Sequence, residues 1–149
     1  MSKMLQKIAI IASLVTVIGG TLTFVMTWRN LGFGDGFMIS WLSTFALCVL
    51  CIAPIGGVIS YLVHHLVDGT LPNLSKLKQD LVFGLIMALI MESIMAVVTT
   101  INLHGWLAIE VFIKQWGTTF LAALPMGIVF SILMSLVIKR RLTAFLAKA

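Results

Sequence analysis

Residues 81–103 read LVFGLIMALIMESIMAVVTTINL, and this stretch decides the fold class. It contains 23 residues but only one charged side chain, Glu92, at its midpoint. At a rise of ~1.5 Å per residue, a helix of this length spans the ~30 Å hydrocarbon core of a bilayer. In lipid, a single long apolar segment satisfies its backbone hydrogen bonds only as a helix. The stretch therefore predicts a transmembrane helix that carries a carboxyl near mid-membrane.

The rest of the chain has the same apolar character. Of its 149 residues, 60% are hydrophobic and 10% are charged, whereas a soluble domain has roughly 25% charged residues. We therefore predict one all-α integral membrane domain over residues 1–149. The formal charge of +5 forms no basic stripe, so we expect no nucleic-acid binding. Three further segments are long enough to cross a bilayer: Ile8–Trp28, Phe37–Val63 and Phe112–Ile138.

Basic residues flank the four segments unevenly. One side has Lys3, Lys7, Lys76, Lys78, Lys139, Arg140, Arg141 and Lys148. The other side has only Arg29 and Lys114. Because cytoplasmic loops carry an excess of Lys and Arg, we expect both termini and residues 66–80 in the cytoplasm. All four tryptophans fall towards the opposite side, as in an interfacial aromatic belt.

The second half of the chain repeats the first. Residues 25–31 (VMTWRNL) match residues 97–103 (VVTTINL) at a spacing of 72. Residues 52–56 (IAPIG) match residues 123–127 (ALPMG) at a spacing of 71. The two units, residues 5–67 and 77–138, are predicted helical hairpins that each cross the membrane twice. They should therefore share one orientation and be related by a pseudo-two-fold axis along the membrane normal.

The hairpin unit resembles a bacterial inner-membrane family described as a domain of unknown function. The resemblance covers essentially residues 5–141, in tandem. It is carried by an Asn that ends the first span of each unit and by a Trp and a Pro in the second: Asn30, Trp41 and Pro54, then Asn102, Trp116 and Pro125. By the repeat spacing, Trp116 aligns with Phe45 and not with Trp41.

More loosely, the chain is similar to the proteobacterial antimicrobial compound efflux family. Members of that family are also four-span tandem hairpins with a membrane-embedded Glu. This resemblance implies proton-coupled export of cationic compounds. The Glu of that family lies in the first span, where this chain has Gly20 at the position that corresponds to Glu92.

Glu92 is the main candidate functional residue. An ionised carboxyl near the bilayer centre costs several kcal/mol, and no Lys or Arg lies at the same depth, so we expect Glu92 to be protonated at rest. Such a group can exchange its proton for a cation, which is the minimum requirement of an antiporter. Helical spacing predicts a small, polar lining made of Thr16, Thr23, Thr27 and Thr99. The alternative is a packing seam in which protonated Glu92 hydrogen-bonds a Thr or Ser hydroxyl.

Pro54 and Pro125 recur at matching places in the two units. Each proline removes a helix hydrogen bond, so both are candidate hinges. The alternative is an ordinary proline kink, which is common in membrane helices.

The cysteines also allow more than one interpretation. Thiols and thioethers suit soft metals such as Cu(I), although both are also routine core-filling groups. The second repeat has no cysteine, which favours packing. Membrane thiol oxidoreductases use a second cysteine pair, which this chain lacks, so we expect no enzyme activity, no cofactor and no metal site. The residues concerned are Cys48 and Cys51, with Met87, Met91 and Met95.

The sequence thus predicts a small proton-coupled exporter of organic cations, with the bilayer, a cation and a proton as its partners. A homodimer is a candidate assembly, because four helices enclose little volume. The alternative is a non-transporting scaffold or regulatory subunit in which Glu92 fixes helix pairing, and soft-metal transport is a third choice. A transporter should show a polar cavity that reaches Glu92, whereas a scaffold should show a dry seam.

Overall fold

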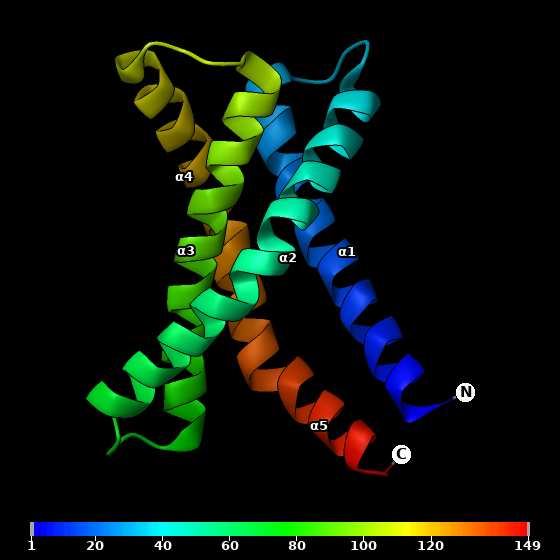
Figure 1. Cartoon of the computed structure of the whole chain (residues 1–149), viewed down its shortest axis with the longest axis vertical. Helices are drawn as coiled ribbons and strands as arrows, with labels where there is room; N and C mark the ends of the chain where they lie inside the picture. The colour runs from blue at the N-terminus through cyan, green and yellow to red at the C-terminus, as the bar shows by residue number, and fades with distance from the viewer. Residues whose placement is uncertain (1, 149) are drawn as a thin grey trace.

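The computed structural model describes residues 2–148 and consists of helices joined by short turns (Figure 1). Four of its helices are long and apolar enough to cross a membrane. The described residues contain no strand, so the predicted all-α membrane fold is confirmed. The helices are α1 (Lys3–Leu31), α2 (Phe37–Thr70), α3 (Lys76–His104) and α4 (Ile109–Leu133), and α4 continues through a π-helical segment, η1 (Met134–Ile138), into α5 (Lys139–Lys148).

The four long helices form two hairpins of the same orientation. The loops that connect α1 to α2 and α3 to α4 lie at one end of the bundle, here called the hairpin end (Figure 1). The start of α1, the turn between α2 and α3, and α5 lie at the opposite end, here called the terminal end. α1 and α3 each stop at a glycine with positive φ, Gly32 at 69° and Gly105 at 71°. Because glycine adopts this conformation without steric cost, the sequence ends both helices at corresponding places.

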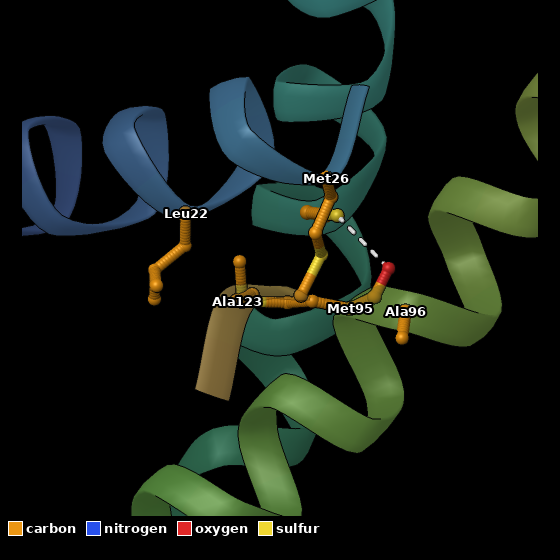
Figure 2. Packing of buried hydrophobic residues seen from close by; sticks show 6 residues of the cluster. Leu22, Met26, Met95, Ala96 and Ala123 are labelled. Atoms are coloured by element: carbon orange, nitrogen blue, oxygen red, sulfur yellow. Dashed lines mark hydrogen bonds between the residues drawn. The ribbon is translucent and has the colours of Figure 1, made fainter. Parts of the chain in front are cut away.

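The hydrophobic core lies towards the hairpin end. Figure 2 shows Met26 of α1, Met95 of α3 and Ala123 of α4 packed together. The buried residues of α1 all fall within residues 20–27, whereas the first half of this helix is largely exposed. Towards the terminal end α1 and α2 diverge (Figure 1). Half of the bundle is therefore tightly packed and the other half is open.

Reciprocal hydrogen bonds join the two hairpins. Asn30 Nδ2 on α1 donates to Thr119 Oγ1 on α4 at 2.8 Å. Asn102 Nδ2 on α3 donates to Thr44 Oγ1 on α2 at 2.8 Å. Each asparagine thus reaches from the first helix of one hairpin to the second helix of the other, as a pseudo-two-fold arrangement requires.

Two half-buried tryptophans, Trp41 and Trp116, correct the predicted repeat alignment. Trp41 Nε1 donates to the Gly20 carbonyl at 3.0 Å, and Trp116 Nε1 donates to the Ser93 carbonyl at 3.0 Å. Trp116 is therefore the structural counterpart of Trp41, and its alignment with Phe45 is wrong. The cause is that the second repeat is four residues, about one helical turn, shorter between its Trp and its Pro.

The predicted aromatic belt is also corrected for these two residues. Trp28 and Trp106 are exposed, as belt residues should be. Trp41 and Trp116 are half-buried and fasten the two helices of their own hairpin, so they have a packing role.

Candidate functional site

A cavity of about 500 Å³ lies among α1, α2, α3 and α4, and it is open on one side. Two of its walls are α1 and α2, the helices that diverge towards the terminal end (Figure 1). Of the residues that line it, only Cys48, Glu92 and Ser131 carry a polar side-chain group. The structure thus has an open cavity that reaches Glu92, but its lining is apolar, which differs from the polar cavity predicted for a transporter.

The Glu92 side chain crosses from α3 to α4 and lies directly over Gly127. Its exposed fraction is 1%. A Cβ atom at position 127 would lie 1.1 Å from Glu92 Oε1 and 2.3 Å from Glu92 Cδ. Only glycine therefore leaves room for the carboxyl where it lies.

Neither carboxyl oxygen of Glu92 has a hydrogen-bond partner within residues 2–148. The structure therefore does not show the predicted packing alternative, in which protonated Glu92 hydrogen-bonds a Thr or Ser hydroxyl. A buried polar atom without a partner costs roughly 1–3 kcal/mol. Such groups in native proteins call for an explanation, such as a catalytic or binding role.

The four threonines predicted to line a path to Glu92 lie elsewhere. Thr16, Thr23 and Thr99 each donate to the carbonyl four residues earlier in their own helix, at 2.7–2.8 Å. Thr23, Thr27 and Thr99 are buried near the hairpin end, while Thr16 is exposed. None of the four lines the cavity. The predicted polar lining is corrected because α1 turns an apolar face, including Ile18 and Leu22, towards the cavity.

Sequence reasoning missed the residues that surround Glu92. Ser131 follows Gly127 by one helical turn, lines the same cavity and is 8% exposed. Its Oγ has no partner among the described residues. The signal available in the sequence was the recurrence of small residues at every fourth position of the third and fourth spans, a spacing that permits close helix packing. Glu92 and these small residues together are here called the α3–α4 seam. They are Gly84, Ala88 and Glu92 on α3 and Gly127, Ser131 and Ser135 on α4 and η1.

The two prolines lie inside α2 and α4, where the sequence placed them. Pro54 and Pro125 are both exposed, and neither lines the cavity. Figure 1 shows α2 changing direction near its middle, the part of the helix that contains Pro54. A proline bend accounts for this change of direction.

The two cysteines, Cys48 and Cys51, have different surroundings. Cys48 belongs to the buried core, and its Sγ lies 3.9 Å from the Met95 carbonyl oxygen, the contact drawn in Figure 2. Cys51 does not line the cavity, whereas Met91 and Met95 do. In the part of the chain that the structure describes, no three His, Cys, Asp or Glu side chains form a group that could hold a metal ion.

Comparisons with known proteins bear on the family. A search of curated proteins and a search of solved structures gave no match. The sequence model of a family described as Domain of unknown function (DUF2798) matches residues 3–71 and again residues 76–147. The first match contains α1 and α2, and the second contains α3, α4 and most of α5. Because the two matches cover nearly the whole chain and each corresponds to one hairpin, the protein belongs to the DUF2798 family as a tandem of two copies.

Proposed function

We propose that the protein is a proton-coupled exporter of small organic cations with apolar substituents, and that Glu92 exchanges its proton for the cation. One observation carries the proposal: a buried carboxyl without a partner at the wall of an open, apolar cavity. The volume of about 500 Å³ lies within the range of roughly 300–1,000 Å³ found for ligand pockets.

The surroundings of Glu92 favour a cation with an apolar body. While Glu92 carries its proton, the wall is neutral throughout. When the proton leaves, the carboxylate is the one charged side chain on the cavity wall. Coulombic attraction is much stronger in such a low-dielectric site than in water, so a cation replaces the proton. Proton and cation then compete for one group, and this competition couples their movements.

The two halves of the bundle support a direction of loading. We place the terminal end in the cytoplasm of a bacterial cell, with the protein in the inner membrane, because most basic residues flank that end. The cavity walls diverge towards the same end, so the cation would enter from the cytoplasmic side. At the hairpin end the bonds from Asn30 and Asn102 close the bundle.

The test uses purified protein in liposomes and ethidium, a fluorescent organic cation, under an imposed pH gradient. We expect Glu92→Gln to stay folded, because glutamine keeps the shape of a protonated carboxyl, and to lose gradient-driven flux. Glu110→Gln is the matched control, since Glu110 is an exposed acid at the start of α4, and it should keep wild-type flux.

Binding gives a second readout. Ethidium affinity of the wild type should rise with pH, because loss of the proton frees the carboxylate for the cation. The affinity of Glu92→Gln should be weaker and should not depend on pH. If Glu92→Gln still moves ethidium against a gradient with unchanged pH dependence, the antiporter proposal fails.

The close fit of Glu92 over Gly127 favours a second candidate, a non-transporting scaffold or regulatory subunit. In that case Glu92 acts only as a packing group, and Glu92→Gln should change neither stability nor any functional readout. Soft-metal transport is a third candidate, because Cys48 and Met91 line the cavity. Joint loss of Ag(I) binding and of activity in Cys48→Ala would favour it over the export of organic cations.

A further inference from the structure

Two serine hydroxyls continue the α3–α4 seam from Glu92 towards the terminal end. A Cβ atom on Gly84 would lie 2.8 Å from Ser131 Oγ and 2.9 Å from Ser135 Oγ. Both hydroxyls therefore occupy the space that this glycine leaves open, and no direct hydrogen bond joins them in residues 2–148. Both serines are buried, with exposed fractions of 8% and 6%.

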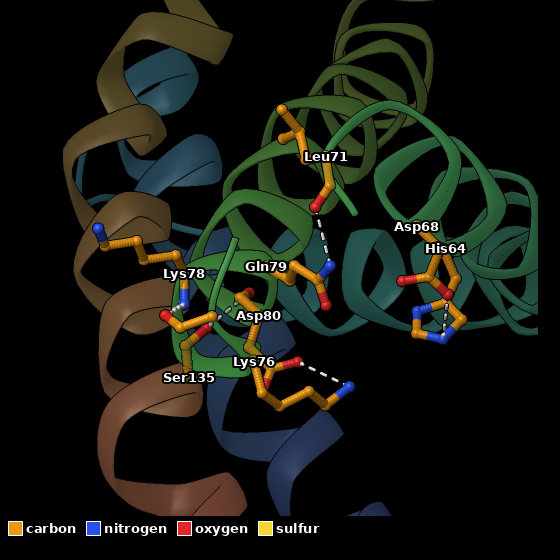
Figure 3. Close-up of polar contacts among 9 residues, drawn as sticks. His64, Asp68, Leu71, Lys76, Lys78, Gln79, Asp80 and Ser135 are labelled. Atoms are coloured by element: carbon orange, nitrogen blue, oxygen red, sulfur yellow. Dashed lines mark hydrogen bonds and ion pairs between the residues drawn. The ribbon is translucent and has the colours of Figure 1, made fainter. Parts of the chain in front are cut away.

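The seam extends from the Glu92 carboxyl at one end to the Asp80 backbone at the other. Ser135 Oγ donates to the Asp80 carbonyl oxygen at 3.1 Å (Figure 3). The Asp80 side chain is 15% exposed and lies 3.6 Å from Lys76 Nζ, so it reaches the surface at the terminal end. At the other end, Ser131 lies one turn from Gly127, over which the Glu92 carboxyl sits.

Ser131 Oγ and both Glu92 oxygens are buried without a partner in residues 2–148, and both residues line one cavity. A water molecule that bridges buried polar atoms typically makes two to four hydrogen bonds, and it satisfies such groups. The hydroxyl and the carboxyl are therefore placed to share one mobile proton through water.

The two repeats differ at some positions along the seam and agree at others. Glu92 corresponds to Gly20 in the first repeat, and Ser131 corresponds to Ser60. Asp80, beside the seam, corresponds to the apolar Ile8, and the Ser135 hydroxyl corresponds to the His64 imidazole, whereas Gly84 corresponds to Ala12, another small residue. Ser135 also lies in η1, and π-helical segments are frequent at functional sites. The acid and the Ser135 hydroxyl thus occur in the same repeat, whereas the Ser131 hydroxyl has a counterpart in both repeats.

We propose that Ser131 and Ser135 conduct the proton of Glu92 from the cavity wall along the α3–α4 seam to the terminal end at Asp80. This inference rests on the proposed function, because it assumes that Glu92 releases a proton during turnover. Among the described residues that line the cavity, Cys48 is the only other titratable side chain, and Lys76 is one charged group that lies beside Asp80. The apolar wall itself offers no chain of proton acceptors.

The proton balance of the relay is simple. The O–H bond of Glu92 breaks, a carboxylate remains, and a bridging water takes the proton. Each serine hydroxyl accepts one proton from a bridging water and gives up its own proton to the next water, so it ends unchanged. Water at the surface beside Asp80 is the final acceptor. No oxidant, reductant or leaving group takes part.

The test follows the proton on Glu92 directly in protein reconstituted in lipid nanodiscs. After a rapid upward pH jump, infrared spectroscopy measures how fast the C=O band of the protonated carboxyl disappears, and Glu92→Gln identifies that band. We expect Ser131→Ala and Ser135→Ala to slow its loss by about tenfold or more. Gly84→Ala keeps both serines but places a methyl within 2.8–2.9 Å of their hydroxyls, so it should slow the loss as well.

Ser60→Ala is the matched control, because it is the repeat counterpart of Ser131 and should leave the rate unchanged. The final band intensity should be the same in all variants, since a relay changes the rate and not the equilibrium. A serine with only a structural role would alter stability and leave this rate alone. Wild-type rates in all three seam variants would overturn the relay, and so would an equal slowing in Ser60→Ala.

The readout needs no transported cation, so the two proposals fail separately. Wild-type rates together with Glu92-dependent ethidium flux reject the relay alone. Slowed rates without flux of any cation reject export alone. A Glu92 band that never responds to pH rejects both.

Discussion

Gly127→Ala is the most direct test of the site geometry. The added Cβ would lie 1.1 Å from Glu92 Oε1 and 2.3 Å from Glu92 Cδ, far inside contact distance. The carboxyl must then leave its place against α4, or the two helices must separate. Forcing an extra methyl into a packed site typically costs about 1–3 kcal/mol. We therefore expect the free energy of unfolding to fall by about that amount.

The matched control is Gly56→Ala, the repeat counterpart of Gly127. Its Cβ would lie 3.5 Å from Ile52 Cγ2 and 3.6 Å from Met91 Cε, which are ordinary contacts. Alanine is a better helix former than glycine by about 0.8–1.0 kcal/mol. Gly56→Ala should therefore be neutral or stabilising, although both substitutions add the same methyl group to a helix.

A double-mutant cycle with Glu92→Ala isolates the contact. Once the Glu92 side chain is removed, Gly127→Ala should no longer destabilise, so the coupling free energy should be about 2 kcal/mol. The measurement is reversible unfolding in mixed micelles, followed by circular dichroism. Equal effects of Gly127→Ala with and without the Glu92 side chain would refute the contact, and with it the site geometry.

Three further predictions concern the bundle as a whole. Asn30→Ala and Asn102→Ala should each lower the free energy of unfolding by about 0.5–2 kcal/mol, because each removes a hydrogen bond between the hairpins. The control is Asn73→Ala, in the exposed turn between α2 and α3, which should have no effect. A chain with Ala at both native cysteines should still fold, because we assign them only a packing role. In that background, a cysteine introduced at Lys76 should react with an impermeant maleimide only from the cytoplasmic side, and labelling from outside would contradict the proposed orientation.

The sequence by itself determined the spans, their pairing and the depth of the acid. Hydropathy and length are properties of each segment alone, and they decide whether that segment can span a bilayer. Residues 81–103 therefore already specify a transmembrane helix with Glu92 near its centre. The repeat spacing likewise specifies two hairpins of one orientation. The matching glycines at positions 32 and 105 end the first helix of each hairpin.

Only the tertiary structure decided which side chains face Glu92. Helical periodicity places Thr16, Thr23 and Thr27 on a common face of α1, but it does not fix how α1 is rotated or where it leaves the bundle. In the structure α1 separates from α2 towards the terminal end, so Thr16 is exposed and the cavity receives apolar side chains. The predicted polar path fails for that reason.

The register between α3 and α4 was equally beyond reach of the sequence. Small residues permit close helix approach without specifying a partner, since lipid and apolar side chains offer similar surroundings. The placement of Glu92 over Gly127, and of Ser131 and Ser135 over Gly84, depends on the relative axial position of the two helices. That axial position depends on all contacts along the α3–α4 interface together, so only the folded structure shows it.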